Sequence, residues 1–338
     1  MTGSGIPVVD IGDFQNGGTA GKDRVAKAVA QAFENVGFMT IVGHGFPREV
    51  VAKTRKSASA FFDLPVKRKL QLVSQANKLI RGYLPVGGEA ASLADHKGGP
   101  AIPDLKEAFS VGPLDVTEET LSLDQATAAY APNLWPDKPA SFRVAAETYY
   151  REMERLIFRM LRIFAYALDL PEAFFANYFD KHSCLLRMQN YPEQETEPEP
   201  GQLRIGEHTD YGAFTLVNTD NAPGGLQVLA RSKQWIDVFP APNSFVVNIS
   251  DMMMTWTNDR WISNSHRVVN PPRGIQGATR RLSIAFFVNP NHDALIECIP
   301  TCQGPDNPPR HASVLAGEHR FRKLQQTDRL IGVDQMPR

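Results

Sequence analysis

Residues 185–191 read LLRMQNY, a short run of large apolar and aromatic side chains that is typical of a buried β-strand. Similar runs recur downstream, separated by Gly, Pro and Asn residues, which favour turns. They are FTLVNT (214–219), GLQVLA (225–230), SFVVNI (244–249), SHRVV (265–269) and LSIAFFV (282–288). Many short strands at close spacing predict an antiparallel sandwich or barrel in this half of the chain.

The first half of the chain favours helices, with short strands expected only at residues 6–11 (IPVVDI) and 38–42 (FMTIV). Residues 139–168 give the longest helical pattern, with apolar side chains recurring along one face. Residues 84–104 are rich in Gly, Ala and Pro and predict a long loop, a kind of segment that often serves as a lid. We therefore expect one structural domain with three parts. They are a helix-rich N-terminal region (1–180), a β-rich core (181–300) and a helical C-terminal segment (301–338).

Charge and composition exclude several classes of protein. Lys and Arg number 36 and Asp and Glu number 37 among 338 residues, which gives no electrostatic reason to expect binding to nucleic acid or to an anionic membrane. No stretch approaches the roughly 18 apolar residues of a membrane-spanning helix, and the N-terminus has no signal-peptide pattern. The three irregularly spaced cysteines favour free thiols in a reducing compartment, with a Cys298–Cys302 pair as the alternative, so we expect a cytoplasmic protein.

The sharpest local signal is GEHTDYG at residues 206–212. In an extended segment, residues two apart project from the same face, so His208 and Asp210 point together. An imidazole beside a carboxylate is a mixed nitrogen and oxygen donor set that Fe(II) accepts well. This pair therefore predicts part of an iron site.

The same motif also has a plain structural explanation. An isolated His-x-Asp arises often by chance, and a single histidine is more often a surface or core residue than a metal ligand. A second histidine, His266 in SHRVV, favours the metal interpretation, because a neighbouring strand of a sandwich could bring it opposite the first pair. Three protein ligands on one side of an octahedral ion leave three positions for reactants, so the predicted site would be catalytic.

Arg281 and Ser283 would share one face of the strand that continues as IAFFV. A guanidinium and a hydroxyl together suit a carboxylate that must be held in one orientation. The alternative is an exposed strand arginine, which is a good description of the adjacent Arg280. The apolar residues around Arg281 indicate a buried strand, where an arginine needs a partner.

Taken together, HTD at 208–210, S-x-x-H-R-V around His266 and R-x-S at 281–283 resemble the signature of the isopenicillin N synthase-like family of Fe(II)/2-oxoglutarate-dependent oxygenases. The resemblance covers nearly the whole chain. It includes IPVVDI, GFMTIVGHG, FFDLPVKRKL, RGYLP, DLKEAFSVG, GGLQV, NISDMMMTWTNDRW and FFVNPNHDALIECIP. Within the family, GEHTDYG, DLKEAFSVG, HRVVNPP and NPNHDALIE are similar to microbial members such as thymine 7-hydroxylase.

The resemblance implies a fold, a reaction and its cofactors. The fold would be a double-stranded β-helix, a cupin-like jelly roll with flanking helices. Fe(II), held by His208, Asp210 and His266, would use O2 and 2-oxoglutarate to oxidise a small organic molecule, most commonly by hydroxylation, while 2-oxoglutarate is converted to succinate and CO2. Arg281 and Ser283 would bind the distal carboxylate of 2-oxoglutarate. Natural-product intermediates of secondary metabolism are among the expected substrates.

One departure from the family concerns the strand before the metal motif. Many plant relatives carry Asn-Tyr-Tyr-Pro there and use a side chain of that run to bind 2-oxoglutarate. Here the run is Gln189-Asn190-Tyr191-Pro192. Either Gln189 or Asn190 is expected to take over the contact.

Candidates for the substrate side are Arg81 and Tyr83 in RGYLP, Phe109 in KEAFSVG and Phe287 beyond the R-x-S motif. Core packing explains Phe109 and Phe287 as well as a pocket role does.

Two rival functions remain. Isopenicillin N synthase itself and aminocyclopropanecarboxylate oxidase carry similar motifs but do not consume 2-oxoglutarate. A non-catalytic binding protein could also keep the fold, although it would be expected to lack a ligand, and none is missing here. The sequence gives no indication of the oligomeric state or of the atom oxidised.

Overall fold

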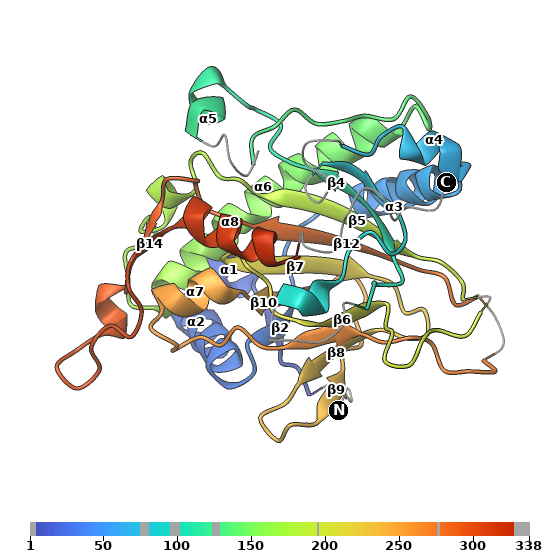
Figure 1. Ribbon diagram of the computed structural model, residues 1–338. Helices are drawn as coiled ribbons and strands as arrows, with labels where there is room; N and C mark the ends of the chain where they lie inside the picture. Colours follow the sequence, from blue (N-terminus) through green and yellow to red (C-terminus); the bar gives the residue numbers. More distant parts are fainter. Residues whose placement is uncertain are drawn as a thin grey trace.

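Two β-sheets form the centre of the molecule in a computed structural model (Figure 1). The structure describes residues 5–74, 81–94, 102–123, 129–194, 196–275 and 278–327. The larger sheet has eight strands in the order β1-β2-β10-β7-β12-β5-β4-β3. Their bounds are Val8–Asp10 (β1), Phe38–Val42 (β2), Phe245–Ile249 (β10), Phe214–Thr219 (β7), Arg281–Val288 (β12), Leu185–Tyr191 (β5), Glu107–Val111 (β4) and Gly82–Leu84 (β3).

The smaller sheet has four strands in the order β6-β11-β8-β9, which run Ile205–His208, His266–Val268, Leu226–Leu229 and Trp235–Asp237. A short hairpin of β13 (Leu295–Ile296) and β14 (Val314–Leu315) follows. The sheets form the predicted double-stranded β-helix, or jelly roll. All strand pairs in its two sheets are antiparallel except β1 with β2, among the described residues.

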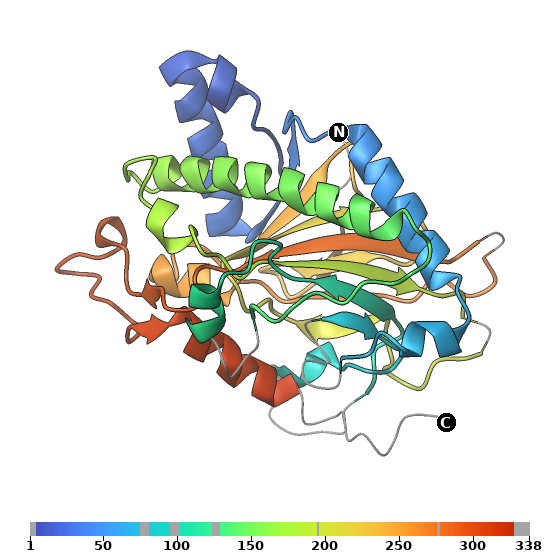
Figure 2. The ribbon, with the colours of Figure 1, turned by 90° about the horizontal axis from the view of Figure 1, so that it is seen from above.

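Three helices, α2 (Gly18–Asn35), α3 (Arg48–Phe62) and α6 (Phe142–Ala167), cover one face of the larger sheet, as Figure 2 shows. The longest, α6, lies inside the predicted helix. Its buried stripe packs on the sheet through aromatic rings, with centroids 4.9 Å apart for Phe164 and Phe214 and 5.0 Å apart for Tyr150 and Phe286. Edge-on packing of large rings is a strong source of core stability. The remaining helical segments are α1 (Asp13–Asn16), α4 (Val66–Leu70), η1 (Ala91–Ala94), α5 (Glu118–Leu123), η2 (Ala176–Tyr178), α7 (Asp251–Trp256), η3 (Pro300–Cys302) and α8 (Ala316–Thr327).

Strand β12 shows how the sheet separates the core from the site. Leu282, Ile284 and Phe286 join the hydrophobic core beneath the helices. The alternate residues, Arg281 and Ser283 among them, line a cavity on the other face of the sheet. The period of two in a strand places these two sets on opposite faces. The predicted common face of Arg281 and Ser283 is therefore present.

The N-terminal region is not helical alone. Strands β1 to β4 all come from residues before 181. β2 pairs with β10 and β4 pairs with β5, and β1 and β3 form the two outer edges of the larger sheet. The predicted boundary at residue 180 therefore does not separate a helical layer from a β-sheet core. The short strands expected at 6–11 and 38–42 are present as β1 and β2, whereas β3 and β4, three and five residues long, have no clear strand pattern in the sequence.

The expected loop at 84–104 contains the one-turn helix η1 and is tied by backbone hydrogen bonds from Gly87 N to Asp104 O and from Asp104 N to Glu89 O. Residues 95–101 of this loop, and residues 328–338 of the predicted C-terminal segment, lie outside the described residues. The described part of that segment contains helix α8, which lies on the side of the larger sheet opposite α6 (Figure 2).

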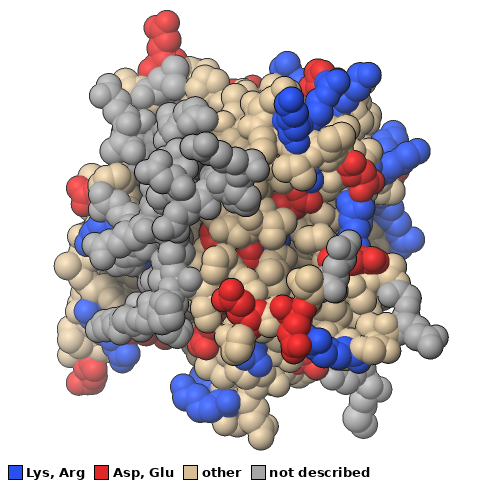
Figure 3. Space-filling model, turned by 45° about the vertical axis from the view of Figure 1, so that its right-hand side comes forward, with Lys and Arg blue, Asp and Glu red and all other residues tan. Residues whose placement is uncertain are grey.

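Among the described helices, none is long and apolar enough to cross a membrane. The face drawn in Figure 3 carries acidic and basic side chains interspersed among uncharged ones, in keeping with the balanced composition.

Candidate metal centre

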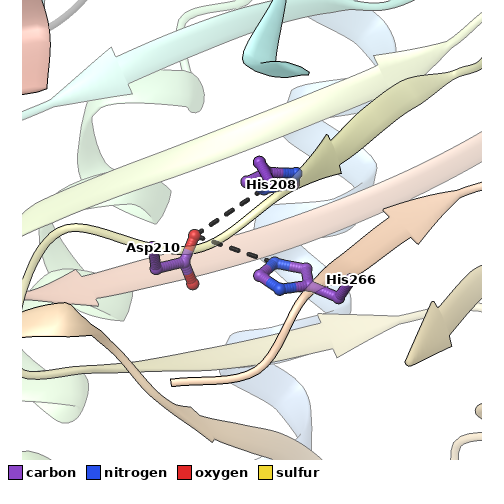
Figure 4. Close-up of side chains that lie close together, drawn as sticks. All are labelled: His208, Asp210 and His266. Atoms are coloured by element: carbon purple, nitrogen blue, oxygen red, sulfur yellow. Dashed lines mark ion pairs between the residues drawn. The ribbon is translucent and has the colours of Figure 1, made fainter. Parts of the chain in front are cut away.

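His208, Asp210 and His266 converge on one point between the two sheets (Figure 4). His208 ends β6, Asp210 follows it in the next turn, and His266 begins β11. The antiparallel register of β6 and β11 pairs His208 directly with His266. Asp210 Oδ1 lies 3.8 Å from Nε2 of each histidine, and the ligand atoms of all three residues lie within 4.8 Å of one another.

The backbone orients both imidazoles. His208 Nδ1 lies 2.9 Å from the carbonyl oxygen of Gly206, and His266 Nδ1 lies 3.2 Å from that of Asn264. A proton on each Nδ1 would be donated to these carbonyls, which leaves both Nε2 lone pairs for a metal. Such outer hydrogen bonds fix the tautomer and ring orientation of metal-binding histidines.

Hydrogen bonds also orient the carboxylate of Asp210. Its Oδ2 accepts hydrogen bonds from Thr215 Oγ1 at 2.6 Å and from Asn248 Nδ2 at 2.8 Å. Burial by itself raises the pKa of this carboxyl, but the imidazoles of His266 and His208 and the two hydrogen bonds outweigh it and lower the pKa. The carboxylate is thus kept charged, with Oδ1 directed at the histidines.

These donors fit Fe(II). Two neutral imidazoles and one carboxylate on one side of an ion are the facial set of non-haem iron oxygenases. In the part of the chain that the structure describes, this is the one group of three or more His, Cys, Asp or Glu side chains arranged to hold a metal.

A cavity of about 160 Å³ lies beside the triad. Its far wall is built from alternate residues of β5 and β12, which pair Arg281 with Tyr191, Ser283 with Gln189, Ala285 with Arg187 and Phe287 with Leu185. Thr215, Val217 and Thr219 of β7 and the triad itself complete the central part. The cavity therefore has two ends, one at Arg281 and one at Phe287.

Arg281 lies buried at its end of the cavity, with 4% of its side chain exposed. Nη1 donates to the carbonyl oxygens of Ala222 and Gly224 at 2.8 and 3.3 Å, and Nη2 donates to Thr219 Oγ1 at 2.7 Å. These acceptors are all uncharged. Burial lowers the pKa of the guanidinium. An anion bound here would therefore stabilise its charged form.

The sequence offers Gln189 and Asn190 as candidates for a hydrogen bond to 2-oxoglutarate. Of the two, only Gln189 lines the cavity. Gln189 Nε2 and Tyr191 OH lie 3.5 and 3.4 Å from Ser283 Oγ, so the three polar groups form one cluster beside Arg281. Asn190 projects to the opposite face of β5, where its amide donates to Glu107 Oε1 at 2.8 Å. The expectation for Asn190 is corrected on this basis.

Three of the four expected substrate residues also lie outside the cavity lining. Tyr83 donates its hydroxyl to Glu107 Oε2 at 2.6 Å, within the same buried cluster as Asn190. Arg81 donates to the carbonyl oxygens of Ala129 and Ala131 at 2.6 and 2.9 Å. Phe109 is fully buried against the rings of Phe61 and Phe142. Core packing and backbone tethering account for these three residues.

Phe287 alone of the four lines the cavity, together with Leu185 and with Leu324 of α8. Charged residues that the sequence reasoning missed lie at the same end. Glu89 Oε1 accepts a hydrogen bond from Arg187 Nη1 at 3.1 Å, and Glu89 Oε2 contacts Lys106 Nζ. Arg187 could have been found from the alternation along β5, but Glu89 and Lys106 come from non-strand segments without a pattern.

A second buried arginine supports the Arg281 end. Arg204 donates to the carbonyl oxygens of Pro223 and Gly224 at 2.7 and 3.1 Å, so it holds the same loop as Arg281. Burial, with a smaller contribution from Arg281, lowers the pKa of Arg204 to about 10. Two buried arginines therefore lie around one loop at this end of the cavity.

Known proteins share both the sequence and the fold. Residues 6–138 match a family model described as the N-terminal region of non-haem dioxygenase in morphine synthesis. Residues 172–290 match the family model of the 2OG-Fe(II) oxygenase superfamily. The chain is 32% identical over 319 residues to the 2-oxoglutarate-Fe(II) type oxidoreductase hxnY of Emericella nidulans, covering 93% of this chain and 88% of the relative. It is 31% identical over 308 residues to a homoarginine-6-hydroxylase of Arabidopsis thaliana, covering 88% of each.

Among solved structures, the thymine 7-hydroxylase of Neurospora crassa in complex with α-ketoglutarate superimposes with a TM-score of 0.81 and 29% identity, covering 95% of this chain and 96% of that one. The same enzyme with α-ketoglutarate and thymine bound gives a TM-score of 0.81 at 30% identity, with the same coverage of both chains. Together with the His-Asp-His geometry, these matches establish that the chain belongs to the 2OG-Fe(II) oxygenase superfamily and is an iron- and 2-oxoglutarate-dependent dioxygenase.

Proposed function

We propose that this dioxygenase hydroxylates a C–H bond of a small polar molecule bound at the Phe287 end of the cavity. His208, Asp210 and His266 hold the iron, and Arg281 holds the distal carboxylate of 2-oxoglutarate. The observation that carries the proposal is the cavity that joins the triad to a buried guanidinium on one side and to Phe287 on the other.

The Arg281 end has the chemistry that a carboxylate requires. It offers a buried guanidinium with uncharged acceptors on Nη1 and Nη2, and Ser283, Gln189 and Tyr191 lie beside it as hydrogen-bonding groups. A charge-assisted bond to a carboxylate is stronger than a bond between neutral groups. Arg281 and the three triad residues line the same cavity, so one bound anion could contact both.

When bound, iron and 2-oxoglutarate supply the oxidising chemistry, in which one atom of O2 enters the substrate and the other enters succinate, with loss of CO2. The protein positions the reactants and excludes water. The cavity lies between the two sheets, so both reactants are surrounded by fixed side chains.

The Phe287 end suits a small molecule with an apolar body and polar groups. Phe287, Leu185 and Leu324 supply apolar surface, and Glu89, Lys106 and Arg187 supply an acceptor and donors. Relatives act on or bind molecules of this general kind, since the Neurospora crassa enzyme binds thymine and one sequence relative is a homoarginine hydroxylase. We propose a substrate with both donor and acceptor groups, such as a pyrimidine base or an amino acid.

The experiment is a screen for substrate-dependent succinate release by the Fe(II)-loaded protein, with pyrimidines, amino acids and organic acids as candidates. A true substrate gives product that is heavier by one oxygen atom, and its formation matches succinate formation. Product that has lost two hydrogens without gaining oxygen would instead show desaturation or cyclisation. Oxygen uptake that continues at full rate without 2-oxoglutarate would favour a co-substrate-independent oxidase.

A further inference from the structure

Asp220, just beyond the end of β7, lies between two arginines, Arg55 of α3 and Arg281 of β12. Its Oδ2 is 2.7 Å from Arg55 Nη2, and its Oδ1 is 3.6 Å from Arg281 Nη1. The first distance is that of a strong charged hydrogen bond, and the second is too long for one. The carboxylate is thus bonded to Arg55 and only near Arg281.

Backbone groups and Arg55 of α3 hold Asp220 closer to Arg55 than to Arg281. Asp220 Oδ2 also accepts the amide of Leu282 at 2.9 Å, and Oδ1 accepts the amide of Ala222 at 3.2 Å. Arg55, which comes from α3, is itself held by Asn218 Oδ1 at 3.2 Å and by the carbonyl oxygen of Leu282 at 3.0 Å. The side chains of Arg55 and Asp220 are only 23% and 30% exposed, so water screens their interaction incompletely.

The position of Asp220 matters because a carboxylate and a co-substrate would compete for Arg281. Arg281 Nη1 and Nη2 already donate to uncharged groups, and among the described residues no carboxylate makes a hydrogen bond with this guanidinium. A carboxylate that moved from 3.6 Å into direct contact would neutralise the charge that the distal carboxylate of 2-oxoglutarate needs.

We propose that Arg55 is a positioning residue for co-substrate binding. Together with the backbone amides of Leu282 and Ala222, it holds Asp220 away from Arg281 and so reserves that guanidinium for 2-oxoglutarate. The inference rests on the proposed role of Arg281. It gives a function to a side chain on the helix side of the sheet, outside the cavity that holds the reactants.

The test is the affinity of the Fe(II)-loaded protein for two keto acids, measured by calorimetry without oxygen. One is 2-oxoglutarate, and the other is 2-oxopentanoate, which has the same carbon chain but no distal carboxylate. Arg55→Gln is expected to raise the Kd for 2-oxoglutarate about five- to tenfold, within the range of coupling in one salt-bridge network. The Kd for 2-oxopentanoate should be unchanged.

The double variant Arg55→Gln/Asp220→Asn separates this explanation from a simple loss of positive charge. Because the released carboxylate is the cause of the weaker binding, removing it should recover part of the affinity for 2-oxoglutarate. An unchanged Kd in Arg55→Gln, an equal loss for both keto acids, or a double variant no better than the single one would each overturn the inference.

Arg280→Gln is the matched control. Arg280 also links β12 to α3, through Asp63 and the carbonyl oxygen of Ser59, but it lies on the face away from the cavity. Its substitution should leave both affinities unchanged. Arg281→Gln tests the proposed function separately. If it does not weaken 2-oxoglutarate binding, Arg281 does not hold the co-substrate carboxylate. If Arg281→Gln weakens 2-oxoglutarate binding but Arg55→Gln does not, only the role of Arg55 is excluded.

Discussion

His208 and His266 lie directly opposite each other on antiparallel strands, and their ring centroids are 4.2 Å apart. This pairing depends on register, because a slip of one residue between β6 and β11 would turn one imidazole to the other face of the sheet. The turn after β6 then brings Asp210 back toward both rings. The metal site is therefore a product of strand pairing, and each of its three side chains can be tested alone.

Replacement of His208 or Asp210 by Ala should abolish iron-dependent succinate formation. The rate should fall by at least about 100-fold, because each substitution removes a metal ligand rather than an outer-shell contact. The fold should persist, since neither side chain belongs to the hydrophobic core. Succinate release, bound iron and circular dichroism are the measurements. His311→Ala, at an exposed histidine paired with Asp259, is the control and should keep full activity. A fully active Asp210→Ala enzyme would exclude that residue from the triad.

Arg281→Ala should raise the 2-oxoglutarate concentration needed for half-maximal activity by at least about 30-fold, which corresponds to the roughly 2 kcal/mol lower limit for a buried charged contact. Steady-state succinate release at varied 2-oxoglutarate measures the effect. Arg280→Ala, one residue away on the opposite face of β12, should change the requirement little. If both variants behave like the parent enzyme, the co-substrate carboxylate is held elsewhere.

Phe109 and Phe287 should respond differently to the same substitution. Phe109→Ala leaves a cavity in the core and should lower the free energy of unfolding by about 3–5 kcal/mol. Phe287→Ala, at a partly exposed position in the cavity wall, should cost much less stability but raise the KM of the substrate. Urea unfolding and steady-state kinetics separate the two effects. Equal losses of stability would show that Phe287 also serves mainly as packing.

The free energy of unfolding should depend on pH through the protonation of His182. Burial by itself lowers the pKa of this imidazole, but Cys184 and the carboxylate of Glu154, 3.2 Å away, outweigh it and raise the pKa to about 10. Because the folded-state pKa is higher than the unfolded one, the stabilisation is complete below pH of about 6.5 and is lost as pH rises toward 10.

His182→Gln should therefore lower the free energy of unfolding by about 2 kcal/mol at pH 6, as expected for a hydrogen bond to a charged group. The difference from the parent protein should shrink at pH 9.5. Urea unfolding at several pH values gives both numbers. A difference that does not depend on pH would mean that the imidazole is neutral in the folded protein.

Strand periodicity was enough to predict much of the site. Arg281 and Ser283 are two residues apart in β12, and an extended segment places such a pair on one face without any knowledge of the fold. His208 and Asp210 are also two apart, but β6 ends at His208, and the turn that follows it brings Asp210 to the site. The choice between Gln189 and Asn190 was left open because a single strand does not say which face is inside. The register of β5 with β12 pairs Gln189 with Ser283 and places Gln189, not Asn190, on the cavity face.

The substrate end could not be predicted in this way. Glu89 and Lys106 lie outside regular strands and reach the cavity through tertiary contacts with Arg187 and with each other. The sequence pattern points to Tyr83 and Asn190 as site residues, but both contact the buried carboxylate of Glu107, where Lys69 supplies the counter-charge at 2.7 Å. A sequence does not distinguish a buried charge that serves the fold from one that serves a ligand.

The most direct measurement is an anaerobic titration of the protein with Fe(II) and then with 2-oxoglutarate, followed by visible absorption. If iron is held by His208, Asp210 and His266 and the keto acid is anchored by Arg281, one iron binds per chain and a metal-to-ligand band then appears and saturates with one 2-oxoglutarate per iron. The Asp210→Ala protein should give no band, and the Arg281→Ala protein should saturate only at much higher concentration. Binding of iron with no band on addition of 2-oxoglutarate, or an unchanged titration in both variants, would contradict the account.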